Sequence, residues 1–405
     1  MNEPSNQVPG IPPEKLREKP ISLLGRMAYV SGFVLIVAAV VAFSPELTKR
    51  IAYAWNIGTE QAKAKVARQF LAENPHSEQR IAWVAKAVAP GVVGIQVISP
   101  RLPDDGMLRG LSEILDTEVG SGVIVDAEEG YILTNFHVIA NAHAILVRLN
   151  DGREVEAEIV GRNRAVDLAV LRIDMDDLEA VEWGDSQQVV IGEQVVAMGS
   201  PYGLQQTVTS GIISATERYN SRLVMRRAGH GARPIPQELL QTDAAINPGN
   251  SGGALVDMNG KLIGICTAII SVESGGNSGI GFVIPSFTAK QIYEEIISHG
   301  EVKHGWIGIA GLDEVTSFDA RKMNQKMPKG AIVKYFARGV SPALIAGLQR
   351  GDIILRWGET EITNPLHLIH LVTLTEPGTK ETVEVFRQGE TMTFEITVGT
   401  RPTEL

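Results

Sequence analysis

The run Gly-Asn-Ser-Gly-Gly at residues 249–253, with the residues that follow it, constrains the fold of this chain most strongly. A serine between glycines also occurs in the nucleophile elbow of α/β-hydrolases, where a helix follows the serine. Here the apolar segments 254–256 and 262–265 flank Asp-Met-Asn-Gly at 257–260, which predicts a strand, a tight turn and a second strand. Because no helical period follows Ser251, we expect a β protein rather than an α/β-hydrolase.

Two residues earlier in the chain suit Ser251 as partners in nucleophilic catalysis. A serine hydroxyl needs a base, an orienting carboxylate and donors for the developing oxyanion. His137 follows an apolar segment and Asp167 directly precedes another. The order His, Asp, Ser is found in the two-barrel proteases, whereas in α/β-hydrolases the acid and the histidine follow the serine. We therefore predict Ser251 as nucleophile, His137 as proton carrier and Asp167 as the carboxylate that fixes the imidazole.

The chain resembles the HtrA family of serine proteases from about residue 77 to its C-terminus, and is most similar to the membrane-anchored DegS-like branch with one PDZ domain. The motifs that carry the resemblance are residues 120–124, 134–138, 167–171, 241–247, 249–253 and 279–285. The resemblance implies a mostly β fold: a chymotrypsin-like double β-barrel, trypsin-like serine protease domain at 76–300, followed by one α+β PDZ domain at 301–400 and preceded by a transmembrane helix.

Composition narrows the possible functions. The net charge of −10 argues against a nucleic-acid partner, which requires a basic face. Cys266 is the one cysteine in the sequence, so no internal disulfide is possible. A cysteine nucleophile is disfavoured, because no histidine motif accompanies Cys266. No metal-ligand spacing occurs, since His367 and His370 are expected on a solvent-exposed helix face, and we expect no metal and no cofactor.

Residues 27–43 contain no charged side chain and are almost wholly apolar, which predicts a membrane anchor at 27–44. A cleaved signal peptide is the alternative, but a long polar lead precedes the segment and a clear small-x-small cleavage site is absent. The basic residues before the anchor favour a cytoplasmic tail at 1–26 and a periplasmic enzyme body, on the outer side of the inner membrane. Residues 45–75 should form a helical linker, with an amphipathic helix at 59–74.

The protease domain should consist of two barrels at residues 92–185 and 189–284, then a helix at 286–298 that ends at Gly300. We expect the catalytic cleft between the barrels, since pockets commonly form at such junctions. The polar segment 99–116 is predicted as a surface loop.

Further site residues are predicted around the serine. The backbone N–H groups of Gly249, Asn250 and Ser251 should form the oxyanion hole. The resemblance implies that Arg218 supports this loop and that the loop at 219–238 senses a ligand of the PDZ domain. The residues expected to wall the S1 pocket are Ala244, Ile246, Cys266 and Ala268. Their small or medium size, without an acid, predicts an apolar P1 side chain.

The last hundred residues should bind peptides. PDZ domains take a C-terminal peptide as an added strand, and backbone N–H groups of a glycine-containing loop hold its carboxylate. By resemblance, that loop comprises Trp306, Ile307, Gly308 and Ile309, and Ile369 lines the groove from a helix at 365–374.

The main functional hypothesis is a regulatory serine endopeptidase of the envelope stress response. C-termini of misfolded outer-membrane proteins would bind the PDZ domain, and the protease would then cut a membrane-bound anti-sigma factor. The resemblance also implies a homotrimer. Two alternatives remain: a general quality-control protease or chaperone of misfolded periplasmic proteins, and a PDZ scaffold whose protease fold is catalytically silent.

Overall fold

The computed structural model describes residues 45–74, 76–98, 117–200, 206–219, 238–247, 249–271, 277–300, 302–323 and 328–402. The described residues from Ile57 onward belong to one compact unit, which is separate from the residues before it. The predicted tail, the predicted membrane anchor at 27–44, the loop at 99–116 and most of the loop at 219–238 lie outside the described residues. In the part of the chain that is described, no helix is both long enough and apolar enough to span a membrane.

Two helices precede the first sheet: α2 (Pro45–Glu73) and α3 (Arg80–Val88). A 3₁₀ turn, η1 (Ala89–Gly91), connects α3 to the first strand. α3 buries Val84, Ala87 and Val88, which recur at helical spacing and so share one face. The rings of Phe70 and Trp83 stack with their centroids 4.4 Å apart, so the end of α2 packs on α3. The helix predicted at 59–74 is thus the C-terminal part of α2.

The first half of the predicted protease domain is a seven-stranded antiparallel sheet. Its strands are β1 (Val92–Ile98), β2 (Thr117–Asp126), β3 (Tyr131–Thr134), β4 (Ala144–Arg148), β5 (Glu154–Glu156), β6 (Glu158–Asn163) and β7 (Leu168–Arg172). They follow the order β5-β4-β1-β2-β3-β7-β6. In the described residues, pairing between β5 and β6 does not close this sheet into the expected first barrel. Alternate residues Val93, Ile95 and Val97 enter one core, as the two-residue period of a strand requires.

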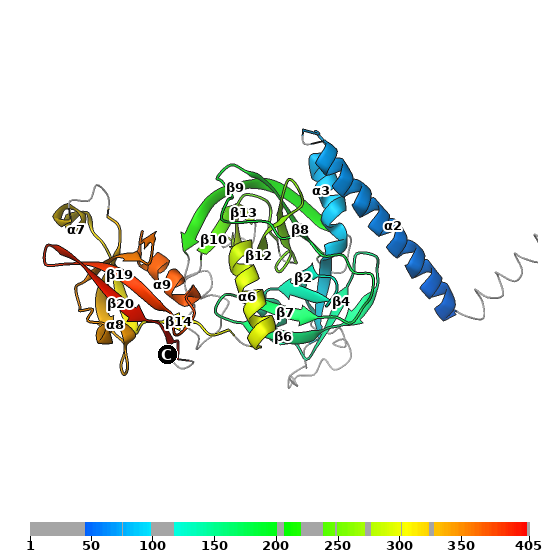
Figure 1. The fold of residues 1–405 in the computed structure, drawn as a ribbon. Helices are drawn as coiled ribbons and strands as arrows, with labels where there is room; N and C mark the ends of the chain where they lie inside the picture. Colours follow the sequence, from blue (N-terminus) through cyan, green and yellow to red (C-terminus); the bar gives the residue numbers. More distant parts are fainter. Residues whose placement is uncertain are drawn as a thin grey trace, which may run out of the picture. The chain divides into compact units, whose positions relative to one another are not determined.

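The second half is a closed barrel with the order β10-β13-β12-β11-β8-β9, visible in green to yellow in Figure 1. Its strands are β8 (Gln194–Gly199), β9 (Thr207–Tyr219), β10 (Glu238–Thr242), β11 (Ala254–Asp257), β12 (Leu262–Ser271) and β13 (Asn277–Pro285). β11 and β12 form the predicted hairpin. The Asp257 carboxylate accepts N–H groups of Asn259 and Lys261, each at 2.8 Å, which fixes the turn. The hairpin prediction is confirmed.

The two halves share one hydrophobic core. A single cluster contains Val123 and Leu168 from the first sheet and Val196 and Leu262 from the barrel. Helix α6 (Ser286–His299) adds Ile292 and Ile296 to it, and contacts strands of both halves (Figure 1). Gly300 ends α6 with a φ of 74°, as predicted, because glycine adopts this left-handed conformation without steric cost. Residues of the two halves are therefore held in one rigid body.

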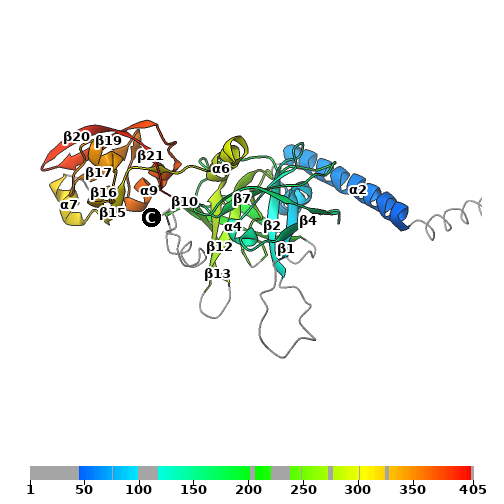
Figure 2. The ribbon, with the colours of Figure 1, turned by 90° about the horizontal axis from the view of Figure 1, so that it is seen from below.

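The C-terminal domain, residues 302–402, has its own sheet and core (Figure 2). The strands follow the order β15-β16-β17-β19-β20, and β18 pairs with β17. They are β15 (Ile309–Glu314), β16 (Ala331–Phe336), β17 (Ile353–Trp357), β18 (Thr360–Glu361), β19 (Lys380–Arg387) and β20 (Glu390–Thr397). Strands β14 (Gly305–Trp306) and β21 (Gly399–Thr400) pair separately. The helices are α7 (Ser317–Lys322), α8 (Pro342–Ile345) and α9 (Pro365–Leu374), the last as predicted.

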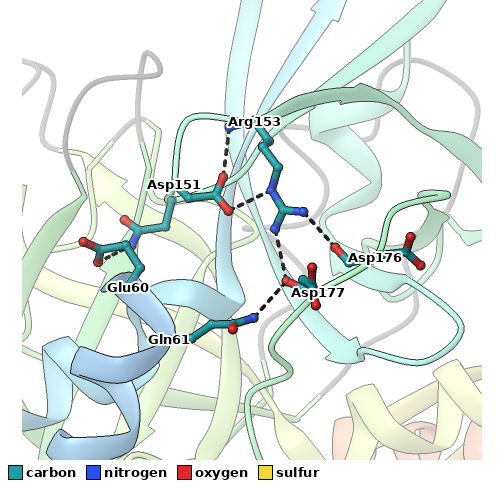
Figure 3. A network of polar contacts seen from close by, with 7 residues as sticks. Glu60, Gln61, Asp151, Arg153, Asp176 and Asp177 are labelled. Atoms are coloured by element: carbon teal, nitrogen blue, oxygen red, sulfur yellow. Dashed lines mark hydrogen bonds and ion pairs between the residues drawn. The ribbon is translucent and has the colours of Figure 1, made fainter. Parts of the chain in front are cut away.

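A polar network joins the start of the compact unit to the first sheet (Figure 3). The Arg153 guanidinium bonds the Asp151 carboxylate at 2.8 Å and the carbonyl oxygens of Asp176 at 2.8 Å and Asp177 at 3.1 Å. The amide of Gln61, on α2, donates to the same Asp177 oxygen at 3.4 Å. The planar guanidinium of Arg153 thus connects its own loop, which contains Asp151, to the loop that contains Asp176 and Asp177.

His304 makes the stability of the fold depend on pH. Burial, with a smaller contribution from the charge of Arg401, lowers the pKa of His304 from 6.5 to about 4. Between these pH values the unfolded chain binds a proton that the folded chain does not, so the free energy of unfolding decreases as pH falls. We expect His304→Asn to reduce this pH-dependent loss of stability by on the order of 2 kcal/mol, measured from denaturant unfolding curves across the pH range. His299→Asn, which alters an exposed histidine, is the control. Identical pH dependence in wild type and His304→Asn would contradict this assignment.

Candidate active site

His137 lies just after β3, on the short helix α4 (Phe136–Ile139). Asn135 precedes the helix in an extended conformation, with φ −79° and ψ 144°, and so turns the chain toward Asp167. The His137 N–H donates to Asp167 Oδ1 at 2.9 Å, and its ring Nδ1 lies 2.7 Å from Asp167 Oδ2. The structure therefore brings together the predicted base and carboxylate directly.

Asp167 adopts a left-handed backbone conformation, with a φ of 57°, immediately before β7. Aspartate tolerates this region better than most residues. Its carbonyl oxygen accepts the Phe136 N–H at 3.1 Å and the Asn135 amide at 3.0 Å. The Thr267 hydroxyl donates to its Oδ2 at 2.8 Å. With backbone and carboxylate both held, the direction of the carboxylate is fixed before any reaction begins.

The loop that carries Ser251 packs against the segments that hold this pair. Its neighbour Gly252 donates its N–H to the carbonyl of Cys266 at 2.8 Å, one residue before Thr267. A Cβ on Gly252 would lie 2.4 Å from Thr134 Oγ1 and 3.2 Å from the Asn135 N, so the serine loop packs against the segment that leads into His137. With a φ of 83° as well, residue 252 must be glycine. The serine loop is thus held by contacts from both the first sheet and the barrel.

Two N–H groups of the serine loop are available for an oxyanion. Among the described residues, the N–H groups of Gly249 and Ser251 have no protein acceptor. Asn250 requires a correction, because its N–H donates to the Asn247 carbonyl at 2.9 Å and is therefore already used. Gly249 has a φ of 99°, which a residue with a side chain rarely adopts. We retain Gly249 and Ser251 as the predicted donors.

Arg218 and the S1 residues lie in the second barrel. Arg218, exposed on β9, donates from Nε to the Gln241 side chain on β10 at 3.2 Å. Ala244, Ile246 and Cys266 are 0 to 1% exposed and belong to the barrel core. Burial raises the pKa of the Cys266 thiol to about 12, so it stays protonated and unreactive near neutral pH. The backbone of Ala268 lies on β12, opposite Phe282.

The predicted peptide loop of the C-terminal domain connects β14 and β15. Trp306 ends β14 and Ile309 begins β15, while Ile307 is buried in the core between them. Gly308 has a φ of 76°, and a Cβ there would lie 2.5 Å from the Ser341 Cα. Ile369 is half-buried on α9. The prediction that His367 and His370 lie on a solvent-exposed face of this helix is wrong, because these side chains are only 8% and 5% exposed.

Two polar residues that serve the site were missed from the sequence. Thr267 orients Asp167, and it carries no motif beyond its place after Cys266. Ser121, buried on β2, donates its hydroxyl to the Gly249 carbonyl at 2.6 Å. Ser121 lies inside the motif at 120–124, but that motif supported only the family resemblance and did not predict that Ser121 contacts the serine loop.

The arrangement can activate an alcohol. With the Asp167 carboxylate beside Nδ1, a ring proton held on Nδ1 would make Nε2 the basic nitrogen of His137. An attacking Ser251 hydroxyl could transfer its proton to that nitrogen. The N–H groups of Gly249 and Ser251, which have no acceptor in the described part of the chain, could stabilise negative charge on a carbonyl oxygen.

Comparisons with known proteins agree with this chemistry. Residues 120–265 match the family described as trypsin-like peptidase domain. A probable periplasmic serine endoprotease DegP-like of Hahella chejuensis is 41% identical over 300 residues, covering 73% of this chain and 60% of that protein. The periplasmic pH-dependent serine endoprotease DegQ of Escherichia coli is 40% identical over 283 residues, covering 70% of this chain and 59% of that protein. The chain thus spans about 60% of the length of these curated relatives.

The chain also resembles solved structures over nearly their whole length. An HtrA-type protease AlgW with a bound tripeptide is 40% identical, with a TM-score of 0.66, covering 80% of this chain and 97% of that chain. A serine endoprotease from Yersinia pestis is 35% identical, with a TM-score of 0.56, covering 80% and 98%.

Removal of the Thr267 hydroxyl should weaken the nucleophile. Thr267→Val preserves shape but deprives the Asp167 carboxylate of a donor, and hydrogen bonds to charged groups contribute about 1.5–3 kcal/mol. We expect the rate at which a fluorophosphonate labels Ser251 to fall roughly tenfold, at the lower end of that range. Thr288→Val, a similarly buried threonine on α6, should label at the wild-type rate. Equal rates for all three proteins would show that Thr267 does not orient the site.

Proposed function

This chain belongs to the HtrA family of serine proteases, and we propose that it is a serine endopeptidase of the cell envelope whose activity responds to peptides. The observation that carries the proposal is the fixed pair of Asp167 and His137, with the serine loop packed against the segment that leads into His137 and the N–H groups of Gly249 and Ser251 unoccupied among the described residues. This combination supplies base, orienting acid, nucleophile and oxyanion donors.

The proposed reaction has two halves. Ser251 Oγ attacks the peptide carbonyl while His137 accepts the hydroxyl proton, and the oxyanion binds to the N–H groups of Gly249 and Ser251. His137 then donates that proton to the leaving amine as the C–N bond breaks, leaving an ester on Ser251. In the second half water attacks the ester carbonyl while His137 accepts its proton, and His137 then donates that proton to Ser251 Oγ as the acyl C–O bond breaks, which releases the acid product and restores the free serine.

We assign the peptide response to the C-terminal domain, as a PDZ domain. β15 is the edge strand of its sheet and α9 packs beside it, so an added strand has room to pair there. The Ile307 carbonyl accepts the Ala343 N–H at 2.9 Å, and the Gly308 carbonyl accepts the Ala337 N–H at 2.9 Å. With these oxygens occupied on one side, the loop can offer N–H groups to a terminal carboxylate on the other.

A contact between the domains supports coupling of peptide binding to catalysis. The His370 Nδ1 on α9 accepts the Glu238 N–H, the first of β10, at 3.3 Å. β10 ends at Thr242, a few residues before the serine loop, and Arg218 bonds its Gln241. A ligand beside α9 could thus shift the loop through β10. The predicted roles of Arg218 and of the loop at 219–238 belong to this part of the proposal.

Location, substrate and assembly are further parts of the proposal. The apolar segment at 27–43 supports an inner-membrane anchor with a cytoplasmic N-terminus, and the relatives' description as periplasmic supports the side on which the protease acts. A membrane-bound anti-sigma factor is the proposed substrate, misfolded outer-membrane proteins the source of peptides, and a homotrimer the assembly. Apolar P1 residues entering near Ala244, Ile246, Cys266 and Ala268 remain the proposed specificity.

A general quality-control protease or chaperone is the second candidate, favoured by the similarity to DegP-like and DegQ proteins. It predicts rapid digestion of unfolded casein without added peptide. A catalytically silent scaffold is disfavoured, because such a protein has no need for the donors that converge on Asp167.

The sensor proposal predicts activation by C-terminal peptides. Addition of apolar-ended peptides with a free carboxylate to the full-length protein should raise the cleavage rate of a reporter substrate by up to roughly 100-fold. Such an increase requires about 2.7 kcal/mol of preferential binding to the active state. The same peptides with an amidated C-terminus are the matched control and should have little effect, since the carboxylate is lost.

Ser251→Ala should bind these peptides with unchanged affinity but retain only background cleavage. Full cleavage by this variant would overturn the assignment of the nucleophile. Cleavage that is rapid and indifferent to either peptide would support the quality-control candidate instead.

A further inference from the structure

Ser121 has a fully buried hydroxyl that connects the two halves of the core at the serine loop. It lies on β2, which pairs with β1 in the first sheet, and its side chain is 0% exposed. Its Oγ donates to the Gly249 carbonyl at 2.6 Å and accepts the Ser200 N–H, at the end of β8, at 2.8 Å. A hydroxyl with one donor and one acceptor role is thereby fully oriented.

The backbone of Ser121 is engaged with the same loop. Its N–H donates to the carbonyl of Ser251 at 2.8 Å, and its own carbonyl accepts the Thr134 hydroxyl at 2.7 Å. Ser121 therefore binds the carbonyl oxygens of Gly249 and Ser251, the two residues whose N–H groups have no acceptor among the described residues. Because each carbonyl is held on the Ser121 side, the conformation of the segment 249–251 is defined from outside the loop.

The surrounding backbone leaves little space for a different residue. A Cβ on Gly120 would lie 3.3 Å from the Ser251 carbonyl oxygen, and one on Gly199 would lie 2.9 Å from Ser121 Oγ. The strand and the loop thus approach at backbone distance, where a small side chain with a donor can reach a carbonyl. A water that replaced the hydroxyl would need the same crowded space.

We propose that Ser121 is a positioning residue for the oxyanion hole: by holding the Gly249 and Ser251 carbonyls, it keeps the N–H groups of these two residues directed at the substrate. This inference rests on the proposed function of the site. Without the hydroxyl, the buried Gly249 carbonyl has no donor among the described residues, so turning of the loop toward another donor would lower its free energy. Turning the loop rotates the Gly249 N–H away from the oxyanion.

A merely structural role for a buried serine is the competing explanation, and the chain contains a matched control. Ser286, 1% exposed at the start of α6, also donates to a carbonyl, that of Gly184 at 2.9 Å, and also accepts an N–H, that of Ser186 at 3.2 Å. Ser286 is not part of the serine loop or its partners. Ser286→Ala should therefore lower stability without altering transition-state binding.

The test compares Ser121→Ala, Ser286→Ala and wild type as full-length proteins. For Ser121→Ala we expect kcat to fall roughly 10- to 100-fold, somewhat less than complete loss of one oxyanion donor, with KM changed less than about threefold. The inhibition constant of a peptide boronate, whose tetrahedral adduct mimics the transition state, should rise by about the same factor as kcat falls. Ser286→Ala should leave kcat, KM and boronate binding at wild-type values.

If Ser121→Ala does not fold, Thr134→Val provides the second measurement, because it releases the Ser121 carbonyl while retaining shape. In Thr134→Val, kcat should fall and the inhibition constant of the boronate should rise, as in Ser121→Ala, but by smaller factors. Wild-type kcat and boronate affinity in the folded Ser121→Ala protein, or in Thr134→Val where Ser121→Ala fails to fold, would overturn the inference while leaving the proposed protease intact. If wild type neither cleaves peptides nor binds the boronate, the proposed function fails and the inference fails with it.

Discussion

The direct packing of the serine loop on the backbone of β2 and β3 is the contact on which the site depends. Ser121 bonds the Ser251 carbonyl, and Gly252 lies against Thr134 and Asn135, so no side chain separates the two segments. Such an approach requires glycine at several positions, and it brings the loop of the proposed nucleophile, from one half, close to the proposed base and acid of the other. The shared hydrophobic core keeps the halves from sliding apart, so the geometry is present before a substrate binds.

The polar residues around the site hold one another in place through a series of hydrogen bonds. Thr267 and the backbone N–H of His137 hold the Asp167 carboxylate, and Asp167 holds the imidazole. Ser121 does the same for the carbonyl oxygens of the serine loop. Thr267 and Ser121 are buried, where an unmatched polar atom is costly, so departures from this geometry are penalised.

The sequence predicted the elements whose signals are local. The hairpin after Ser251, α9 and the glycine that ends α6 each follow from periodicity and turn residues within a short segment, and the structure contains all three. Contacts between distant segments were not predictable in the same way. The burial of His370 depends on Glu238, the occupation of the Asn250 N–H on the turn at Asn247, and the roles of Ser121 and Thr267 on loops from the other half. Composition likewise does not determine which strands pair, so it could not predict that β5 and β6 lie at opposite edges of the first sheet.

We propose that His137, Asp167 and Ser251 act together beside an oxyanion hole formed by Gly249 and Ser251. A crystal structure of the protein with a peptide boronate tests it most directly. We expect a covalent bond from boron to Ser251 Oγ, one boronate oxygen within hydrogen-bond distance of the N–H groups of Gly249 and Ser251, and His137 Nε2 in contact with the adduct. A boronate bound elsewhere, or an adduct whose oxygen meets neither N–H group, would show that these residues do not form the proposed site.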